Sequence, residues 1–273
     1  MAERRVELAT GAMAGLSALG DPLADRLVLL CHATPGASGF DPDPLVTATW
    51  GAHILTLDRP GYGATEPARW FSGASWADDV AAYLRRAEAT ADRISSADFG
   101  SIGVIGWREG GHFAAMLAAQ HPQLVDRLAF VGTPRPSALR DVTSTDPASL
   151  LDSGRFSTPR AEADGPAYRR RVERMLNDAG LHGTAGIESD FAAFAADDVD
   201  YSTITAGTMY VYGARDDLAT ICDANWFAEN APHLTVHRSE AGGRDLISVE
   251  WARILAHVAP DHGWVDQASG PRV

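Results

Sequence analysis

The stretch Gly100-Ser-Ile-Gly-Val-Ile-Gly-Trp-Arg-Glu-Gly-Gly-His-Phe113 decides the fold that we expect for this chain. It begins with an apolar run, Ile102 to Ile105, that is rich in β-branched residues and too short for a helix, so it predicts a buried strand. Apolar residues recur at helical spacing after the stretch, at Phe113, Ala114, Met116 and Leu117. The glycine-rich residues 106–111 lie between the two patterns and predict a sharp turn from strand into helix.

A strand that runs through a glycine-flanked turn directly into a helix is the backbone of a nucleophile elbow, whose pattern is G-x-S-x-G. The residue at the apex of such a turn projects its side chain into a pocket. Here the pattern reads Gly106-Trp-Arg-Glu-Gly110, so Arg108 lies where the pattern has serine. The sequence therefore predicts the backbone of a hydrolase site without its attacking hydroxyl.

Composition limits the classes of function that remain. With 273 residues, 45% of them hydrophobic and 22% charged, the chain is long enough for one large α/β domain with an insertion. The net charge of -13 argues against nucleic acid or an anionic membrane as a partner, since both are polyanions. All 23 basic residues are arginine, and without lysine Schiff-base chemistry is excluded.

Cysteine usage and the N-terminus indicate a cytoplasmic protein. Cys31 and Cys222 do not form a disulfide framework in a chain of this length, and the sequence has no metal-ligand cluster of Cys and His. We therefore expect no metal and no cofactor. Residues 1–5 are charged and lack a signal-peptide apolar run, and no segment is long and apolar enough to be a membrane helix.

Strands and helices alternate along most of the chain, which predicts a mostly parallel sheet covered on both faces. The expected strands cover residues 5–9, 13–19, 27–31, 52–58, 102–105, 128–131, 208–212 and 234–238. Expected helices cover residues 44–50, 75–93, 166–179, 185–197, 223–230 and 246–258, besides the one after the elbow. We interpret the short polar helices of residues 137–205 as a helical cap inserted into a core of residues 1–136 and 206–260, with a polar tail at 261–273.

Five motifs, in order and spacing, resemble the α/β-hydrolase fold superfamily, and within it the group similar to proline iminopeptidases, epoxide hydrolases and small-molecule esterases. They are Cys31-His-Ala-Thr-Pro-Gly36, similar to the oxyanion segment, then Asp58-Arg-Pro-Gly-Tyr-Gly63, the elbow at 106–111, Gly213-Ala-Arg-Asp216 as the acid turn, and Gly242-Gly-Arg244 where the family has its histidine. The resemblance spans about residues 5–258 and implies the α/β-hydrolase fold. It does not establish an activity, because function depends on the site.

The resemblance assigns the family's catalytic positions residue by residue. The acid position falls on Asp216 and keeps its carboxylate. The nucleophile position falls on Arg108 and the histidine position on Arg244, while Ala33 replaces a glycine of the oxyanion segment. The backbone N–H groups of Glu109 and Thr34 are the implied oxyanion donors.

Two arginines at these positions change the chemistry that the site can perform. A guanidinium has a pKa above about 12 and no lone pair to donate, so it serves neither as nucleophile nor as general base. The oxyanion hole and substrate binding alone provide roughly 10³ to 10⁴ over the reaction in water. We therefore do not expect ordinary ester or amide hydrolysis through an acyl-enzyme.

A buried arginine needs a partner, because an unpaired ion costs several kcal/mol to desolvate. The candidate partners are Asp216, Asp217, Glu109 and Asp245. We expect Asp216 to form a bidentate pair with Arg244. Arg108 is then expected to contact Glu109, or the carboxylate, enolate or phenolate of a ligand. The alternative is that hydrolysis has been abandoned and that the arginines form an internal salt-bridge network.

Other residues near these motifs have two interpretations each. Glu109 is a candidate general base, and the alternative is that it neutralises Arg108. His32 is expected to hold the oxyanion loop by a hydrogen bond, with a catalytic role as the alternative. We interpret Cys31 as a core residue, with a nucleophile as the alternative. The aromatic residues are interpreted as pocket wall or core, and they are Trp107, Phe71, Trp70 and Trp76. We interpret a last group as solvated or structural, namely Asp217, His112, His121 and the arginines 169–171.

Three hypotheses of function follow. The first is a cofactor-independent enzyme, in specialised metabolism, that acts on a small anionic or carbonyl-rich molecule by proton transfer, cyclisation, elimination or isomerisation, with arginines and backbone N–H groups stabilising developing negative charge. The second is a non-catalytic pseudo-hydrolase that binds a small molecule or a partner protein. The third is a hydrolase with a relocated nucleophile or an activated water, using Glu109 or Asp216.

Overall fold

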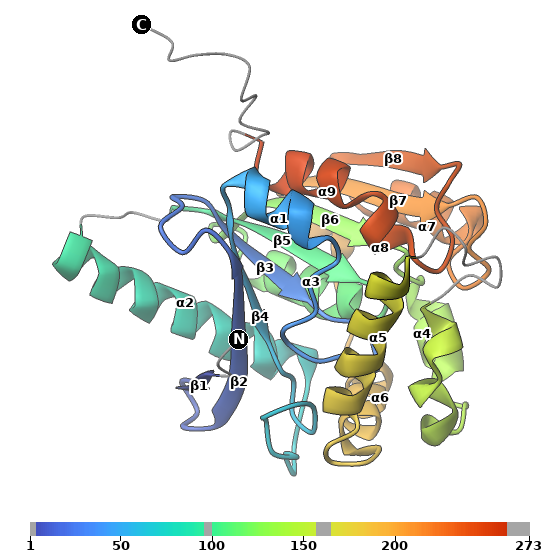
Figure 1. Ribbon diagram of the computed structural model, residues 1–273, viewed down its shortest axis with the longest axis horizontal. Helices are drawn as coiled ribbons and strands as arrows, with labels where there is room; N and C mark the ends of the chain where they lie inside the picture. The colour runs from blue at the N-terminus through green and yellow to red at the C-terminus, as the bar shows by residue number, and fades with distance from the viewer. Residues whose placement is uncertain (1–3, 96–99, 157–164, 261–273) are drawn as a thin grey trace, which may run out of the picture.

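The computed structural model describes residues 4–95, 100–156 and 165–260 and confirms an α/β architecture with a mostly parallel sheet (Figure 1). The sheet has eight strands in the order β1-β2-β4-β3-β5-β6-β7-β8. Their bounds are Arg4–Glu7 (β1), Met13–Gly20 (β2), Leu27–Cys31 (β3), His53–Leu57 (β4), Ile102–Trp107 (β5), Val125–Val131 (β6), Gly207–Gly213 (β7) and Leu234–Ser239 (β8).

The register of the parallel strands brings their carboxyl ends to one edge of the sheet. The β1–β2 and β2–β4 pairs are antiparallel, and the remaining pairs are parallel. Trp107 at the end of β5 pairs with Val131 of β6, which in turn pairs with Val211 of β7. Loops that follow these strands therefore meet above one edge, where open α/β sheets bind ligands.

Helices cover both faces of the sheet (Figure 1). On one face lie α2 (Gly73–Ser95) and α3 (Gly110–Gln120), which pack on each other, and on the other lie α1 (Pro44–Trp50), α8 (Leu246–Val249) and α9 (Trp251–Val258). A further helix, α7 (Ile221–Asn230), packs on β7 and β8. The single helix expected over residues 246–258 is wrong: Glu250, with φ −103° and ψ 12°, leaves the helical conformation and separates α8 from α9.

The segment between β6 and β7, which we call the β6–β7 segment, is helical as expected. It contains α4 (Pro136–Val142), α5 (Pro166–Ala179) and α6 (Ala185–Ala196), and 3₁₀ turns at Pro147–Leu151, Ser153–Arg155 and Tyr201–Thr203. These helices lie beyond the carboxyl ends of the parallel strands (Figure 1). Residues 157–164 of this segment and the expected polar tail, 261–273, lie outside the described residues.

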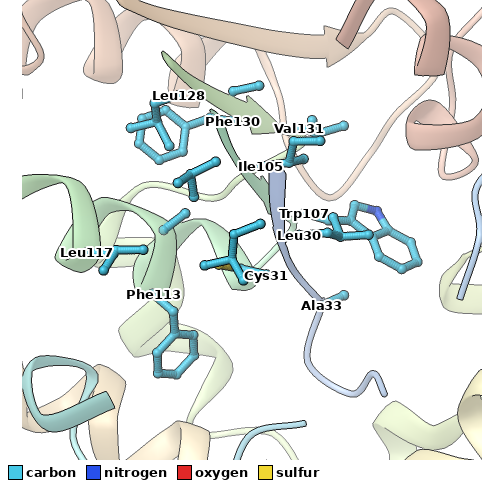
Figure 2. Packing of buried hydrophobic residues seen from close by; sticks show 14 of the residues in the cluster. Leu30, Cys31, Ala33, Ile105, Trp107, Phe113, Leu117, Leu128, Phe130 and Val131 are labelled. Carbon is cyan, nitrogen blue, oxygen red and sulfur yellow. The ribbon is translucent and has the colours of Figure 1, made fainter. Parts of the chain in front are cut away.

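The core is continuous on both sides of the central strands. Every residue of β5 is buried, and α3 is buried over most of its length because it lies between the sheet and α2. Trp107 and Leu30 point to one side of the strands, while Phe113 and Leu117 of α3 pack on the other (Figure 2). Among the described residues, no helix combines the length and the apolar character needed to cross a membrane.

Candidate functional site

The turn between β5 and α3 has the sharp bend that its glycines predict. Arg108 at its apex has a φ of 53°, in the left-handed region that non-glycine residues rarely adopt. Its backbone N–H donates to the carbonyl of Val131 at 2.9 Å, and its carbonyl accepts from Gly111 at 3.0 Å. The backbone of an elbow is therefore present at this position.

Two glycines are required by the close packing of this turn. A Cβ on Gly106 would lie 2.4 Å from the Cα of Gly111, so strand and helix could not meet at this angle. A Cβ on Gly110 would lie 2.3 Å from the carbonyl oxygens of both Cys31 and His32. The start of α3 is thus pressed against the loop after β3, which puts residues 31–34 beside the elbow.

Arg108 is buried and forms an ion pair with Asp216. Its residue surface is 1% exposed, and one terminal nitrogen lies 2.8 Å from Oδ2 of Asp216 and donates a hydrogen bond to Oδ1 at 3.1 Å. The other terminal nitrogen donates to the carbonyl of Arg244 at 3.1 Å. The expectation that Arg108 pairs with Glu109 is therefore wrong, because the side chain extends towards the loop after β7.

Arg244 pairs with Asp217 rather than with Asp216, which corrects the expected bidentate pair. Its Nε and one terminal nitrogen donate to the two oxygens of Asp217 at 2.8 Å and 2.7 Å. The remaining terminal nitrogen donates to the carbonyl of Gly154 at 2.7 Å. The hydrogen bond from Arg244 lowers the pKa of Asp217, and the same bond raises the pKa of Arg244. Asp217, interpreted as solvated or structural, keeps an exposed side chain.

Glu109 is neutralised by an arginine that the sequence analysis missed. Its buried carboxylate forms an ion pair with Arg155 of the β6–β7 segment, and its second oxygen accepts a hydrogen bond from the backbone N–H of Thr34 at 3.2 Å. That N–H is one of the two implied oxyanion donors. No spacing or motif in the sequence connects positions 109 and 155, so this pair could be found only from the structure.

The loop after β3 is held by a histidine that stays neutral. The Nδ1 of His32 lies 2.8 Å from the carbonyl of Ala33, and because a carbonyl only accepts, this nitrogen carries the proton. Burial, followed by the charge of Arg59, holds the pKa of His32 well below its ordinary value. The structure thus contains the loop-holding hydrogen bond that we expected from His32.

A fully buried network lies below this loop, and its function was not recognised in the sequence. Arg59 forms a two-armed ion pair with Asp190 of α6, at 2.8 Å and 2.7 Å. The hydroxyls of Thr34 and Tyr62 donate to the same carboxylate at 2.5 Å and 2.9 Å. Arg59 and Tyr62 belong to the motif at residues 58–63, but nothing in the sequence identifies Asp190 as their partner. The network ties the loop after β3 to the β6–β7 segment.

Aromatic side chains form a wall beside the elbow. Trp107 stacks on Phe40 with ring centroids 4.8 Å apart and contacts Phe156 at 5.0 Å, and it is 1% exposed. Trp76 is buried, as expected for wall or core. Trp70 does not belong to either, because it is 93% exposed.

A hollow of about 320 Å³ lies over this site. Arg155 and Arg244 line it together with Leu150, Asp152 and Leu218. The Nε–H of Arg155 is buried and has no hydrogen-bond acceptor among the described residues. A buried donor without an acceptor is unfavourable by about 1–3 kcal/mol.

Other nucleophile or base candidates have different surroundings. Burial raises the pKa of Cys31 to about 12, so its thiol stays protonated and unreactive. His112 contacts Asp197 and His121 contacts Asp78, each at 3.0 Å, which agrees with structural functions. Among the described residues, no histidine nitrogen forms a hydrogen bond with a hydroxyl or a thiol, and no group of three potential ligands is arranged to hold a metal ion.

Known proteins with similar sequences and folds show the family of this chain. Residues 26–203 match the family model for the alpha/beta hydrolase fold. A pimeloyl-[acyl-carrier protein] methyl ester esterase from Aromatoleum aromaticum is 30% identical over 226 residues, covering 71% of this chain and 80% of that protein. The protein of the same name from Chromobacterium violaceum is 26% identical over 238 residues, covering 73% and 85%. The enol-lactonase from Burkholderia xenovorans LB400 aligns with a TM-score of 0.70 at 17% identity, covering 95% of this chain and 99% of that structure.

The strand order, the elbow backbone and the family match define the class of protein. The chain belongs to the α/β-hydrolase fold family. Within this family it is similar in sequence to the two methyl ester esterases, and in fold to the enol-lactonase.

Proposed function

We propose that this chain is an α/β-hydrolase-fold protein that has lost acyl-enzyme hydrolysis and binds a small molecule above the elbow. In this proposal Arg108 occupies the nucleophile position and Arg244 the histidine position. The ligand presents a carboxylate or carbonyl oxygen to the hollow that Arg155 and Arg244 line. The binding function thus corresponds to the second of the three sequence hypotheses.

The observation that carries the proposal is the pairing of Arg108 with Asp216. Asp216 is the acid that the resemblance assigns to the triad, and the buried guanidinium at the elbow uses its charge. A guanidinium has no lone pair with which to attack a carbonyl carbon. The charge of Asp216 is thus balanced by the guanidinium and not by an imidazole, which argues against a Ser-His-Asp triad.

The position of Glu109 supports the same conclusion. Catalytic oxyanion holes present free N–H groups to the developing negative charge of the substrate. The N–H of Thr34 instead donates to the carboxylate of Glu109, which is itself negatively charged. This N–H is therefore not free to stabilise a developing oxyanion.

The hollow over the site has the size and chemistry of a small-molecule site. Its volume of about 320 Å³ falls at the lower end of the range of roughly 300–1,000 Å³ usual for such sites. Arg155 and Arg244 line it, and guanidinium N–H groups bind carboxylate oxygens well. The ligand is therefore expected to be small and to carry a carboxylate or carbonyl group.

One observation favours the first hypothesis, a proton-transfer enzyme, as a second candidate. Glu109 is buried, and its partner Arg155 comes from the separate β6–β7 segment. If a ligand anion attracted Arg155, the carboxylate of Glu109 would be released from its ion pair and could act as a general base. Glu109 would then remove a proton beside the ligand carbonyl.

The experiment has two stages. In the first, purified protein is treated with a serine-directed fluorophosphonate, and no labelling is expected. In the second, a fragment library of small carboxylic acids, esters and ketones is screened by ligand-observed NMR against the native protein and Arg155→Gln. Hits that bind the native protein and are lost in Arg155→Gln support the binding function.

Fluorophosphonate labelling of the native protein, or an unchanged set of hits in Arg155→Gln, contradicts the proposal. The second candidate is separated by incubating the hits in D₂O. Deuterium incorporation next to the carbonyl that disappears in Glu109→Gln indicates a proton-transfer enzyme.

A further inference from the structure

A second hollow lies between the β6–β7 segment and the loop that precedes α1. Its volume is about 300 Å³, and its lining includes Ser17, Ser38, Phe40, Asp41, Arg171 and Arg174. It shares no lining residue with the hollow over Arg155 and Arg244. Phe40 stacks on Trp107, so the aromatic wall beside the elbow forms part of this lining.

The α5 side of this hollow carries two arginines, Arg171 and Arg174, and one carboxylate, Asp178. Neither Arg171 nor Arg174 forms an ion pair with a described residue, whereas Arg108, Arg155 and Arg244 each do. One terminal nitrogen of Arg171 donates to the carbonyl of Pro42 at 2.9 Å. The Nε–H of Arg171 is buried without an acceptor in the part of the chain that the structure describes.

The opposite side offers hydroxyl and carboxylate groups. Ser17 and Ser38 are buried, and the hydroxyl of Ser17 donates to that of Ser38 at 3.1 Å. Because Ser38 accepts this bond, its own hydroxyl proton remains able to donate to a ligand. The Oδ1 of Asp41 accepts from the hydroxyl of Thr47 at 2.7 Å and from the backbone of Asp43 at 3.1 Å. Its Oδ2 is left to accept from a ligand hydroxyl.

We propose that this hollow is a second ligand site, and that it binds a small hydroxy acid. The carboxylate of the acid accepts hydrogen bonds from Arg171 and Arg174. Its hydroxyl groups donate to Asp41 and exchange hydrogen bonds with Ser17 and Ser38. A simple anion would satisfy only the arginines and would be repelled by Asp41, and a neutral polyol would satisfy only the other side.

Three six-carbon probes separate these requirements. D-gluconate has both a carboxylate and hydroxyls, sorbitol has only hydroxyls, and hexanoate has only the carboxylate. Each is titrated into the full-length protein by isothermal calorimetry. Gluconate is expected to bind, with sorbitol and hexanoate each at least about tenfold weaker, since each loses charge-assisted or neutral hydrogen bonds.

Variants locate the site. Arg171→Gln is expected to weaken gluconate binding at least about tenfold. Arg170→Gln removes the same charge from an exposed position on the same helix and is expected to leave binding unchanged. Arg174→Gln, at an exposed position, gives a second test if Arg171→Gln does not fold.

The proposal is overturned if the native protein does not bind gluconate, if the three probes bind alike, or if Arg170→Gln weakens binding as much as Arg171→Gln. Its failure is distinguishable from failure of the function proposed above. Arg155→Gln changes the other hollow and is expected to leave gluconate binding unchanged.

Discussion

Arg108 carries a permanent charge into a region where its side chain is 2% exposed. Removing a guanidinium from water is unfavourable by several kcal/mol, and only close, well-oriented partners offset this penalty. Asp216 supplies the opposite charge, and the carbonyl of Arg244 accepts a further hydrogen bond. The two charges depend on each other, because each is buried where water cannot replace the partner.

Arg108→Ala is therefore expected to reduce the free energy of unfolding by about 3–5 kcal/mol, since Asp216 would remain buried without its counter-ion. Urea denaturation followed by circular dichroism measures this change. The double variant Arg108→Met/Asp216→Leu removes both charges and is expected to recover most of the loss. A loss no larger than that of Arg170→Ala, which changes an exposed arginine, would contradict this account.

His32 predicts a dependence of stability on pH. Burial and Arg59 lower its pKa in the folded protein from the ordinary value of 6.5. Above pH 6.5 the imidazole is neutral in both states and the folded protein loses nothing. Below pH 6.5 the unfolded chain takes up a proton that the folded protein does not, so stability falls as the pH falls. The expected contribution is about 1.4 kcal/mol per pH unit.

Burial also lowers the pKa values of His53 and His257, so the native protein is expected to lose stability at low pH more steeply than one histidine requires. His32→Gln should reduce the slope of unfolding free energy between pH 6.5 and pH 5.5 by about one proton equivalent. His182→Gln, at a more accessible position, is the control. An unchanged slope in His32→Gln would show that this ring does not remain neutral.

At the scale of elements, the sequence predicted the core better than the site. Strands such as β3 and β5 are continuous apolar runs between turn residues, so their pattern alone identifies them. The helix over residues 246–258 was wrong because its apolar spacing continues across Glu250, where the backbone departs from the helix. Apolar periodicity records which residues face the core, and it does not record a local break.

The site was predicted only in part, because sequence spacing gives the positions of residues but not the directions of long side chains. The elbow backbone at Arg108 follows from its glycines, and it is confirmed. The partners expected for Arg108 and Arg244 were wrong, because an arginine can reach any of several carboxylates at the end of a sheet; Arg108 pairs with Asp216 and Arg244 with Asp217. Arg155 and Asp190 were missed because they belong to the β6–β7 segment, whose approach to the core depends on tertiary packing.

The attachment of α6 to the core is expected to depend on Asp190. Asp190→Ala leaves Arg59 fully buried and unpaired, so we expect a loss of about 3–5 kcal/mol. Hydrogen–deuterium exchange in α6 should increase more than in α2, because the ion pair directly joins α6 to Arg59 in the loop after β4. Asp198→Ala removes an exposed carboxylate from the same segment and should change neither quantity. Equal effects of the two variants would contradict this role of Asp190.

At the scale of the whole molecule, the parallel register places three loops together. The loop after β5 lies within hydrogen-bond distance of the loop after β3, through Glu109 and Thr34, and of the loop after β7, through Arg108 and Asp216. This arrangement belongs to the sheet topology and does not depend on which side chains the loops carry. The backbone of a hydrolase site should therefore accept the side chains of a triad.

The variant Arg108→Ser/Arg244→His is expected to react with a fluorophosphonate, because it restores a hydroxyl and an imidazole next to Asp216. Arg108→Ser alone should not react, since it lacks a general base. Adding Glu109→Ala should increase the rate further by freeing the N–H of Thr34. Intact-mass spectrometry measures the fraction of protein that carries the fluorophosphonate adduct. A folded double variant that stays unlabelled would contradict the proposed assignment of positions 108 and 244.

The φ of 53° at Arg108 has a meaning beyond the ion pair that this residue forms. An arginine side chain is long and flexible, whereas its φ is fixed by the bend between β5 and α3. The tight glycine contacts around the bend have been kept as well. The bend thus keeps the main-chain shape of an elbow whatever side chain it carries, and laboratory evolution that varies side chains alone is expected to begin from that main chain.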